Sequence, residues 1–164
     1  MNLALFASGN GTNVQAIIDA VKAGEIAGNI NCLVCDNPKA YVVKRAKDVG
    51  IDTLILSPKD CQSRQAWELE LIKYLEAHQA EFIILAGFMR IIGADILNHY
   101  PKKIINIHPS LLPAFPGRKG IQDAYNAGVK ESGVTVHYVD AGIDTGEIIA
   151  QERLQIQPEW TLEK

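Results

Sequence analysis

The chain has 164 residues, of which 48% are hydrophobic and 21% charged, and its formal net charge is −3. A chain of this length forms one domain with a sizeable hydrophobic core. The slightly acidic balance gives no electrostatic reason to expect nucleic acid or an anionic membrane as a partner. No apolar run approaches the ~18 residues of a membrane-spanning helix, and the N-terminus lacks the pattern of a signal peptide. We therefore expect a single cytoplasmic domain over residues 1–164.

Strand-like and helix-like segments alternate along the chain, which is typical of an α/β fold with a mostly parallel sheet. Apolar or alternating runs predict strands at Leu3–Ala7, Ile30–Cys35, Ile51–Leu56, Phe82–Ala86, Lys103–Ile107, Val134–Val139 and Glu147–Leu154. Helical patterns and stop signals predict helices at about Val14–Val21, Ala40–Val49, Ser63–His78, Gly93–Asn98 and Ile121–Ala127. The order predicts a Rossmann-like twisted sheet flanked by helices.

Three cysteines, Cys32, Cys35 and Cys61, are an odd number for a disulfide scaffold. The first two form a C-x-x-C pair, but they lie in a predicted strand, where their odd offset sends them to opposite faces. No second Cys or His pair lies at the spacing of zinc ligands. We expect buried, reduced thiols rather than a redox or metal site.

A glycine-rich loop, Ser8-Gly9-Asn10-Gly11-Thr12-Asn13, joins the first predicted strand to the first helix. Glycines allow backbone amides to approach a ligand closely, and a helix N-terminus favours a phosphate. Val14 stands where a dinucleotide-binding loop has its third glycine, and the Gly-Lys-Ser/Thr ending of a Walker loop is missing. The loop therefore predicts a small phosphorylated ligand, with a plain glycine turn as the alternative.

The run Asn106-Ile107-His108-Pro109-Ser110-Leu111-Leu112-Pro113 leaves the fifth predicted strand. Residues two apart on a strand share a face, so Asn106 and His108 are expected to project into one cleft. An amide and an imidazole on stiff backbone suit a reaction in which negative charge develops on a carbonyl oxygen. The alternative is a proline-rich loop whose polar groups satisfy backbone atoms. The remaining histidines are expected to be structural or exposed: His78, His99 and His137.

Two other loops follow predicted strands. Gly87–Ile92 lies after the central strand, where its Phe-Met pair beside Arg90 predicts a slot for a flat ring with an acidic tail. The alternative is core packing with one solvated arginine. Asp140–Gly146 is a turn with two carboxylates, and a carboxylate near His108 would favour the imidazolium. The alternative there is a surface hairpin with solvated acids.

With these motifs the chain resembles the phosphoribosylglycinamide formyltransferases, a branch of the folate-dependent formyltransferases. The Asn-x-His-Pro-Ser-Leu-Leu-Pro string is shared across folate formyltransferases. The Gly-Asn-Gly-Thr-Asn loop and the Gly-Phe-Met-Arg run narrow the resemblance to this branch, and Asp144-Thr145-Gly146 follows in the same order. The resemblance covers essentially the whole chain. It implies the formyltransferase fold and transfer of a formyl group from 10-formyltetrahydrofolate to glycinamide ribonucleotide in purine synthesis.

The resemblance also implies roles for individual residues. Glycinamide ribonucleotide would bind at Gly11, Thr12 and Asn13. Formylfolate would bind at Arg64, Met89, Arg90, Ile91, Ile92 and Asn106. Asn106 and protonated His108 would stabilise the oxyanion formed by direct amine attack, and Asp144 would keep His108 charged. The implied partners are these two small-molecule substrates alone. The protein would be a monomer or homodimer and would need no metal.

The chain departs from the family pattern in two ways. Lys119 stands where many relatives have a histidine. Pro158–Lys164 looks like only the first turn of a helix, so we expect the C-terminal helix to be missing.

Rival readings remain within the family and outside it. Methionyl-tRNA formyltransferases and formyltetrahydrofolate hydrolases share the Asn106/His108 core but usually carry an added domain, and sugar-nucleotide formyltransferases fit the glycine loop less well. A phosphate-ligand binding module is the non-enzyme alternative, and its binding would not depend on His108.

Overall fold

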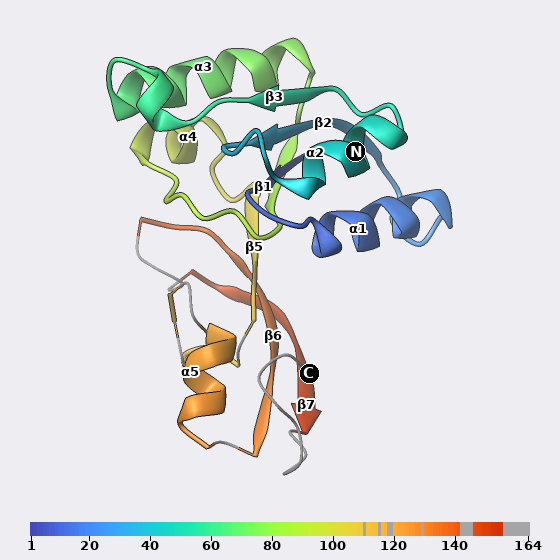
Figure 1. Ribbon diagram of the computed structural model, residues 1–164, viewed down its shortest axis with the longest axis vertical. Coiled ribbons are helices and arrows are strands. Elements are labelled where there is room, and N and C mark those ends of the chain that lie inside the picture. The colour runs from blue at the N-terminus through green and yellow to red at the C-terminus, as the bar shows by residue number, and fades with distance from the viewer. Residues whose placement is uncertain (110, 115, 118–119, 129, 142–145, 156–164) are drawn as a thin grey trace. The chain divides into compact units, whose positions relative to one another are not determined.

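The computed structural model describes residues 1–109, 111–114, 116–117, 120–128, 130–141 and 146–155 (Figure 1). The chain forms two compact units, the first over Met1–Ile104 and the second from Ile105 onward. The boundary falls at the start of the fifth strand, β5 (Ile104–His108). None of the helices in the described ranges is long and apolar enough to cross a membrane.

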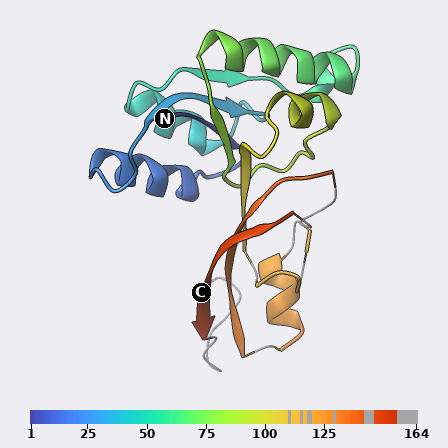
Figure 2. The same cartoon turned by 180° about the vertical axis from the view of Figure 1, so that it is seen from behind.

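The first unit is a parallel sheet, and along the chain each strand is followed by at least one helix before the next strand (Figures 1 and 2). The sheet order is β3-β2-β1-β4, from β1 (Asn2–Ala7), β2 (Asn29–Cys35), β3 (Thr53–Ile55) and β4 (Phe82–Leu85). The helices are α1 (Thr12–Lys22), α2 (Tyr41–Asp48), the short 3₁₀ helix η1 (Pro58–Asp60), α3 (Arg64–Ala77) and α4 (Ala94–His99). Each pairing among these strands is parallel, which confirms the prediction from the alternating segments.

β1 lies in the middle of this sheet and forms the centre of the core. Its residues Leu3–Ala7 each expose at most 2% of their surface. Burial on both faces explains why this strand is a continuous apolar run rather than an alternating one. Val14 of α1 and Trp67 and Leu71 of α3 are also fully buried. The carboxyl ends of β1 and β4 therefore leave a rigid core side by side, with Phe6 opposite Leu85.

The third strand is shorter than predicted, because β3 begins at Thr53 rather than at Ile51. The Ile51 amide donates to the Ala46 carbonyl of α2 at 2.9 Å, so it closes the end of that helix instead of pairing with β2. Gly50 permits this turn with a φ of 75°. The apolar pattern that predicted the strand included Ile51, which closes the C-terminal end of α2. Periodicity alone does not show where that helix end stops and the strand begins.

Cys32 and Cys35 lie on β2 and are completely buried, and all three cysteines are free. Burial raises the pKa of the Cys32 thiol to about 12 and also raises the pKa of Cys35. Both thiols therefore stay protonated and unreactive at neutral pH. The expectation of buried, reduced thiols is confirmed for this pair. Cys61 is only partly exposed.

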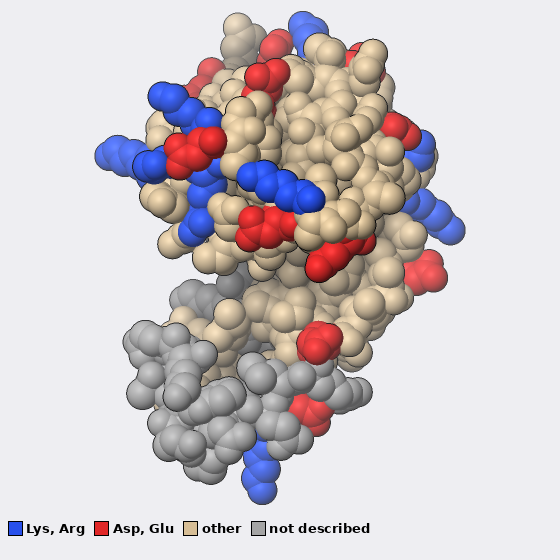
Figure 3. Space-filling model, turned by 90° about the vertical axis from the view of Figure 1, so that its right-hand side faces the viewer, with Lys and Arg blue, Asp and Glu red and all other residues tan. Residues whose placement is uncertain are grey.

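Charged groups of both signs are interspersed over the face of the first unit that Figure 3 presents. This unit has exposed ion pairs within single helices, Lys44–Asp48 at 2.9 Å and Lys73–Glu70 at 3.4 Å. Such pairs contribute little to stability because water screens them. The stability of the first unit therefore comes chiefly from its apolar core.

The second unit contains antiparallel strands. β5 pairs with β6 (Glu131–Tyr138), and β6 pairs with β7 (Ile148–Gln155); the helix of this unit is α5 (Gly120–Asn126). The alternation predicted for β6 is present, but its buried face is the polar one. Thr135 and His137 are at most 2% exposed, whereas Val134 is 38% exposed. A strand that turns polar side chains inward must provide partners for them.

Candidate active site

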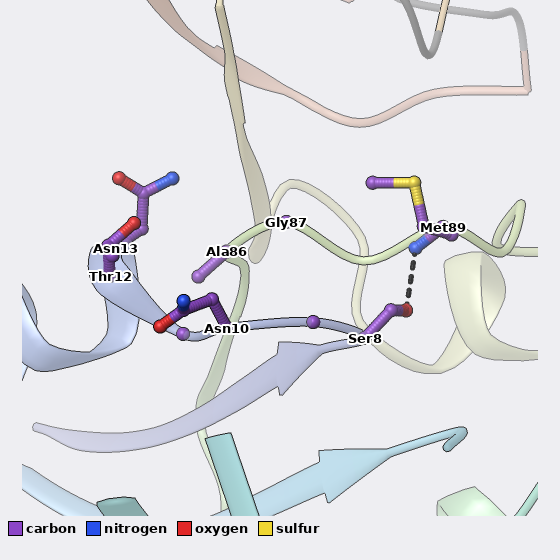
Figure 4. A pocket seen from close by; sticks show the side chains of 9 residues that line it. Ser8, Asn10, Thr12, Asn13, Ala86, Gly87 and Met89 are labelled. Atoms are coloured by element: carbon purple, nitrogen blue, oxygen red, sulfur yellow. Dashed lines mark hydrogen bonds between the residues drawn. The ribbon is translucent and has the colours of Figure 1, made fainter. Parts of the chain in front are cut away.

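A pocket lies where β1 and β4 end in the first unit (Figure 4). Residues of two loops line it: Ser8, Gly9, Asn10, Gly11, Thr12, Asn13, Ala86, Gly87 and Met89. Two hydrogen bonds join the loops. The Ser8 hydroxyl accepts from the Met89 amide at 2.9 Å, and the Ser8 amide donates to the Gly87 carbonyl at 3.1 Å. The predicted phosphate loop and the start of the predicted ring slot therefore share one pocket.

Gly11 precedes α1 and determines the shape of the glycine loop. Its φ of 83° and ψ of 26° lie in the left-handed region, which residues with a Cβ rarely adopt. A Cβ at this position would lie only 2.5 Å from Cγ2 of Val42, a buried side chain of α2. Both the backbone conformation and the close approach of α2 therefore require glycine here.

The first turn of α1 suits an anion. No side chain caps this helix, and its first turn contains no acidic residue. The first amides of an α-helix have no intrahelical partner and carry a partial positive charge. Thr12 and Asn13 are exposed at the rim of the pocket. These features are compatible with the predicted phosphate site, which stays a prediction.

The loop after β4 divides its apolar side chains between the core and the surface. The Phe88 ring packs edge-on against Phe6, with centroids 5.2 Å apart, and parallel to Trp67 at 6.2 Å. Met89 and Ile91 are 44% and 54% exposed. Phe88 is half-buried and packs against two aromatic residues of the core, whereas Met89 is exposed; the predicted slot for a flat ring stays a prediction.

Two arginines, one on α3 and one within the loop, join this loop to neighbouring elements. Arg64 of α3 donates to the Ile91 carbonyl. The Nε of Arg90 donates to Oδ2 of Asp36 at 2.7 Å, at the end of β2, and this carboxylate is almost fully buried. Arg90 is thus ion-paired, while 39% of its side chain remains exposed to solvent. The cation fixes the loop against β2.

Asn106 and His108 stand on β5 opposite two buried polar residues of β6. Asn106 pairs with His137 across the strands, and His108 pairs with Thr135. His108 is only 3% exposed. Asn106 and His108 lie two residues apart on β5, as predicted. Each therefore faces one of two polar residues that are also two apart on β6.

His137 makes a hydrogen bond that orients Asn106. Nδ1 of His137 lies 2.9 Å from the Tyr138 carbonyl oxygen, which can only accept, so Nδ1 carries the hydrogen in this pair. In the neutral ring Nε2 is then an acceptor, and Nδ2 of Asn106 lies 3.2 Å from it. The Asn106 amide is therefore held with its nitrogen toward His137 and its oxygen turned away.

The proline-rich segment after β5 is fastened to the same strands. The Leu112 amide donates to Oγ1 of Thr135 at 3.0 Å, and Nε2 of Gln151 donates to the Leu112 carbonyl at 3.0 Å. Gln151 also donates to Oγ1 of Thr135 at 2.9 Å. Both polar groups of the Leu112 peptide unit are thus satisfied by β6 and β7, which fixes the backbone that follows His108.

A family model described as Formyl transferase matches residues 1–164 of this chain. The chain belongs to the formyl transferase family. It is 49% identical over 160 residues to phosphoribosylglycinamide formyltransferase of Bacillus subtilis (strain 168), covering 98% of this chain and 82% of the relative. The Escherichia coli (strain K12) protein of the same name is 38% identical over 156 residues, with coverage of 95% and 74%.

Solved structures of formyltransferases confirm the fold. The chain matches phosphoribosylglycinamide formyltransferase from Bacillus halodurans with a TM-score of 0.96 and 49% identity, over 99% of this chain and 84% of that one. It matches glycinamide ribonucleotide transformylase 1 from Geobacillus kaustophilus with a TM-score of 0.95 and 52% identity, over 99% and 86%. The predicted α/β class with a mostly parallel sheet flanked by helices is therefore correct.

The residues predicted for the formyltransferase site fall into three groups. Gly11, Thr12, Asn13 and Met89 line one pocket in the first unit. Arg90, Ile91 and the buried Ile92 continue the loop after β4, and Arg64 donates to that loop, but none of these four lines the pocket. Asn106 and His108 lie together on β5. Asp144, Lys119 and Pro158–Lys164 lie outside the described residues.

The hydrogen-bonding roles of four residues were not found from the sequence, although Ser8 lies in the predicted glycine loop and His137 was expected to be structural or exposed. Ser8 and Gln151 act through hydrogen bonds to residues distant in the chain, and no local pattern identifies them. Thr135 and His137 did carry a signal, because their alternation with valines marks one polar face of a strand. The missing step was to recognise that the polar face is the buried one. Within the described ranges no group of three or more His, Cys, Asp or Glu side chains is arranged to hold a metal ion.

Proposed function

We propose that this chain transfers the formyl group of 10-formyltetrahydrofolate to the amine of glycinamide ribonucleotide, a step of purine synthesis. The observation that supports this most directly is the pocket in which the glycine loop and the loop after β4 meet. One loop offers helix N-terminal donors to a phosphate, and the other offers an apolar rim to a ring. The names of the relatives at 49% and 38% identity state formyl transfer and phosphoribosylglycinamide as its acceptor.

The donor folate would lie along Met89–Ile92. The exposed side chains of Met89 and Ile91 provide apolar contact for a pterin, and the backbone of the loop provides hydrogen-bonding edges. Arg64 uses one donor on the Ile91 carbonyl, but a guanidinium has five N–H donors. Arg64 therefore still has donors for the carboxylates of the folate tail.

The chemistry proposed is direct attack of the glycinamide amine on the formyl carbon, without a covalent enzyme intermediate. Asn106 and protonated His108 would stabilise the oxyanion of the tetrahedral intermediate. Asp144 would keep His108 charged and help to move a proton from the incoming amine to the departing folate nitrogen. No residue of the chain needs to hold a metal for these steps.

We also infer that residues 1–164 act as one formyltransferase domain in the cytoplasm, as a monomer or homodimer, without nucleic acid or membrane as a partner. The family match over residues 1–164 supports the single domain. The net charge of −3 offers no attraction to polyanions.

The test is an assay of the purified chain with glycinamide ribonucleotide and 10-formyltetrahydrofolate. Formation of formylglycinamide ribonucleotide, followed by mass spectrometry and by the absorbance of the deformylated folate, is the expected result. Release of formate without glycinamide ribonucleotide would instead identify a hydrolase. Phosphate-ligand binding without turnover, unaffected by His108→Ala, would identify a binding module.

His137→Leu tests the orientation of the Asn106 amide. The substitution removes the acceptor for Nδ2 of Asn106, and one hydrogen bond of this kind contributes about 1 kcal/mol. We expect kcat to fall about tenfold or less, with the KM of glycinamide ribonucleotide little changed. Tyr138→Phe is the matched control, because it keeps the backbone carbonyl that His137 contacts. Equal losses in kcat for both variants would show that β6 is merely disturbed.

A further inference from the structure

Arg45 of α2 makes three hydrogen bonds to the glycine loop and the helix that follows it. Nε donates to the Asn10 carbonyl at 2.7 Å, and Nη2 donates to Oδ1 of Asn10 at 2.7 Å. Nη1 donates to Oε1 of Gln15 on α1 at 3.3 Å. One guanidinium thus joins residues on both sides of Gly11, the glycine at the start of α1.

The rest of α2 supports the same loop. The Val42 amide donates to the Gly9 carbonyl at 3.1 Å. The Val42 side chain occupies the space that a Cβ of Gly11 would need. Gly9, Asn10 and Gly11 therefore each contact α2, and this helix forms the back of the loop that lines the pocket.

The arrangement requires an arginine rather than any cation. Two parallel donors of a planar guanidinium reach a carbonyl oxygen and an amide oxygen of the same residue, Asn10, which an ammonium on a flexible stem cannot reproduce. The Tyr41 ring lies 4.8 Å from the guanidinium carbon and supports its orientation. Among the described acidic side chains, none forms an ion pair with Arg45. Its charge therefore adds to the positive potential at the loop.

We propose that Arg45 is a positioning residue for the phosphate of the acceptor substrate. By fixing the carbonyl and the side chain of Asn10, it holds the peptide units that follow so that the amides of Gly11, Thr12 and Asn13 face the pocket. The inference rests on the proposed function, since it names what shapes the phosphate end of that site. It assigns no role to Arg45 in binding folate or in the chemical step.

Steady-state kinetics of Arg45→Lys and Arg45→Ala tests this role. We expect the KM of glycinamide ribonucleotide to rise about tenfold or more in both variants, since charge-assisted hydrogen bonds contribute about 1.5–3 kcal/mol. The kcat and the KM of formylfolate should change less than about twofold, which is the scatter of such measurements. Failure of Arg45→Lys to restore affinity shows that the fork geometry matters, and not the charge alone.

Lys44→Ala is the matched control. Lys44 precedes Arg45 on the same helix, and its pair with Asp48 is exposed. This variant should keep the wild-type KM for both substrates. Asn10→Ala removes one of the two acceptors, so combining it with Arg45→Ala should raise the KM by less than the product of the single effects.

An unchanged KM for glycinamide ribonucleotide in folded Arg45→Ala would overturn the proposal. So would equal rises in KM for both substrates, because they would indicate a general loss of structure. If Arg45→Ala does not fold, as judged by circular dichroism, Arg45→Lys and Asn10→Ala carry the same test. Lack of formyl transfer by the wild-type chain and by Lys44→Ala alike would refute the proposed function instead, which separates the two failures.

Discussion

His108→Ala is expected to lower kcat about 100-fold or more, and Asn106→Ala is expected to do the same, since each removes a group that we propose donates to charge developing in the transition state. Folate affinity should change much less, because most of the proposed folate contacts come from the loop after β4. Stopped assays for kcat and fluorescence titration for folate Kd separate the two quantities.

His99→Ala is the control for His108→Ala. His99 is half exposed and lies 2.7 Å from Glu76 on the surface of the first unit. It should keep normal turnover, which would show that the loss is specific to the histidine on β5. Near-normal turnover in both His108→Ala and Asn106→Ala would contradict the prediction and require a different catalytic group.

Gly11→Ala is expected to weaken binding of glycinamide ribonucleotide about tenfold or more. The left-handed backbone at φ 83° costs an alanine about 1–2 kcal/mol. Its Cβ would also meet Cγ2 of Val42 at 2.5 Å and the Val42 Cα at 3.1 Å. The buried Val42 side chain cannot yield to this contact cheaply, so the loop is expected to move and its amides to leave the proposed phosphate site. Isothermal titration with the substrate, together with thermal denaturation, measures both effects.

Gly24→Ala separates backbone strain from steric contact. Gly24 has a φ of 78°, but a Cβ added there would meet no atom within 4 Å, and the residue follows α1 at the end away from the pocket. It should lose a similar amount of stability from strain while binding substrate normally. Wild-type affinity in Gly11→Ala would show that the loop does not set the phosphate site.

The parallel strands and the glycine loop could be predicted because their signals are local. A strand buried on both faces, such as β1, must be apolar throughout, and a left-handed turn with a helix behind it must have glycine. These requirements act within a few residues. The sequence pattern therefore located the glycine loop, and the family resemblance selected Gly11, Thr12 and Asn13 within it, all three of which line the pocket.

The hydrogen bonds and ion pairs that hold the candidate site residues in place could not be predicted. They depend on which helices and strands pack against each other in the fold. Arg45 and Asn10 are 35 residues apart, and nothing near either residue indicates the pair. Arg90 seemed free in the sequence because its partner Asp36 ends a different strand. For His137 the period-two pattern was present, but the assignment of its faces required the pairing of β5 with β6.

The two hydrogen bonds of Ser8 have a consequence for how the substrates bind. The Ser8 hydroxyl and amide connect the glycine loop to the Met89 amide and the Gly87 carbonyl. A displacement of either loop by its own ligand is therefore transmitted to the other through these bonds. Thermodynamic linkage then requires the effect to be reciprocal: the factor by which bound folate alters the affinity for the ribonucleotide equals the factor in the opposite direction. If the two loops hold the proposed ligands, Ser8 would couple the affinity of the chain for the donor to its affinity for the acceptor.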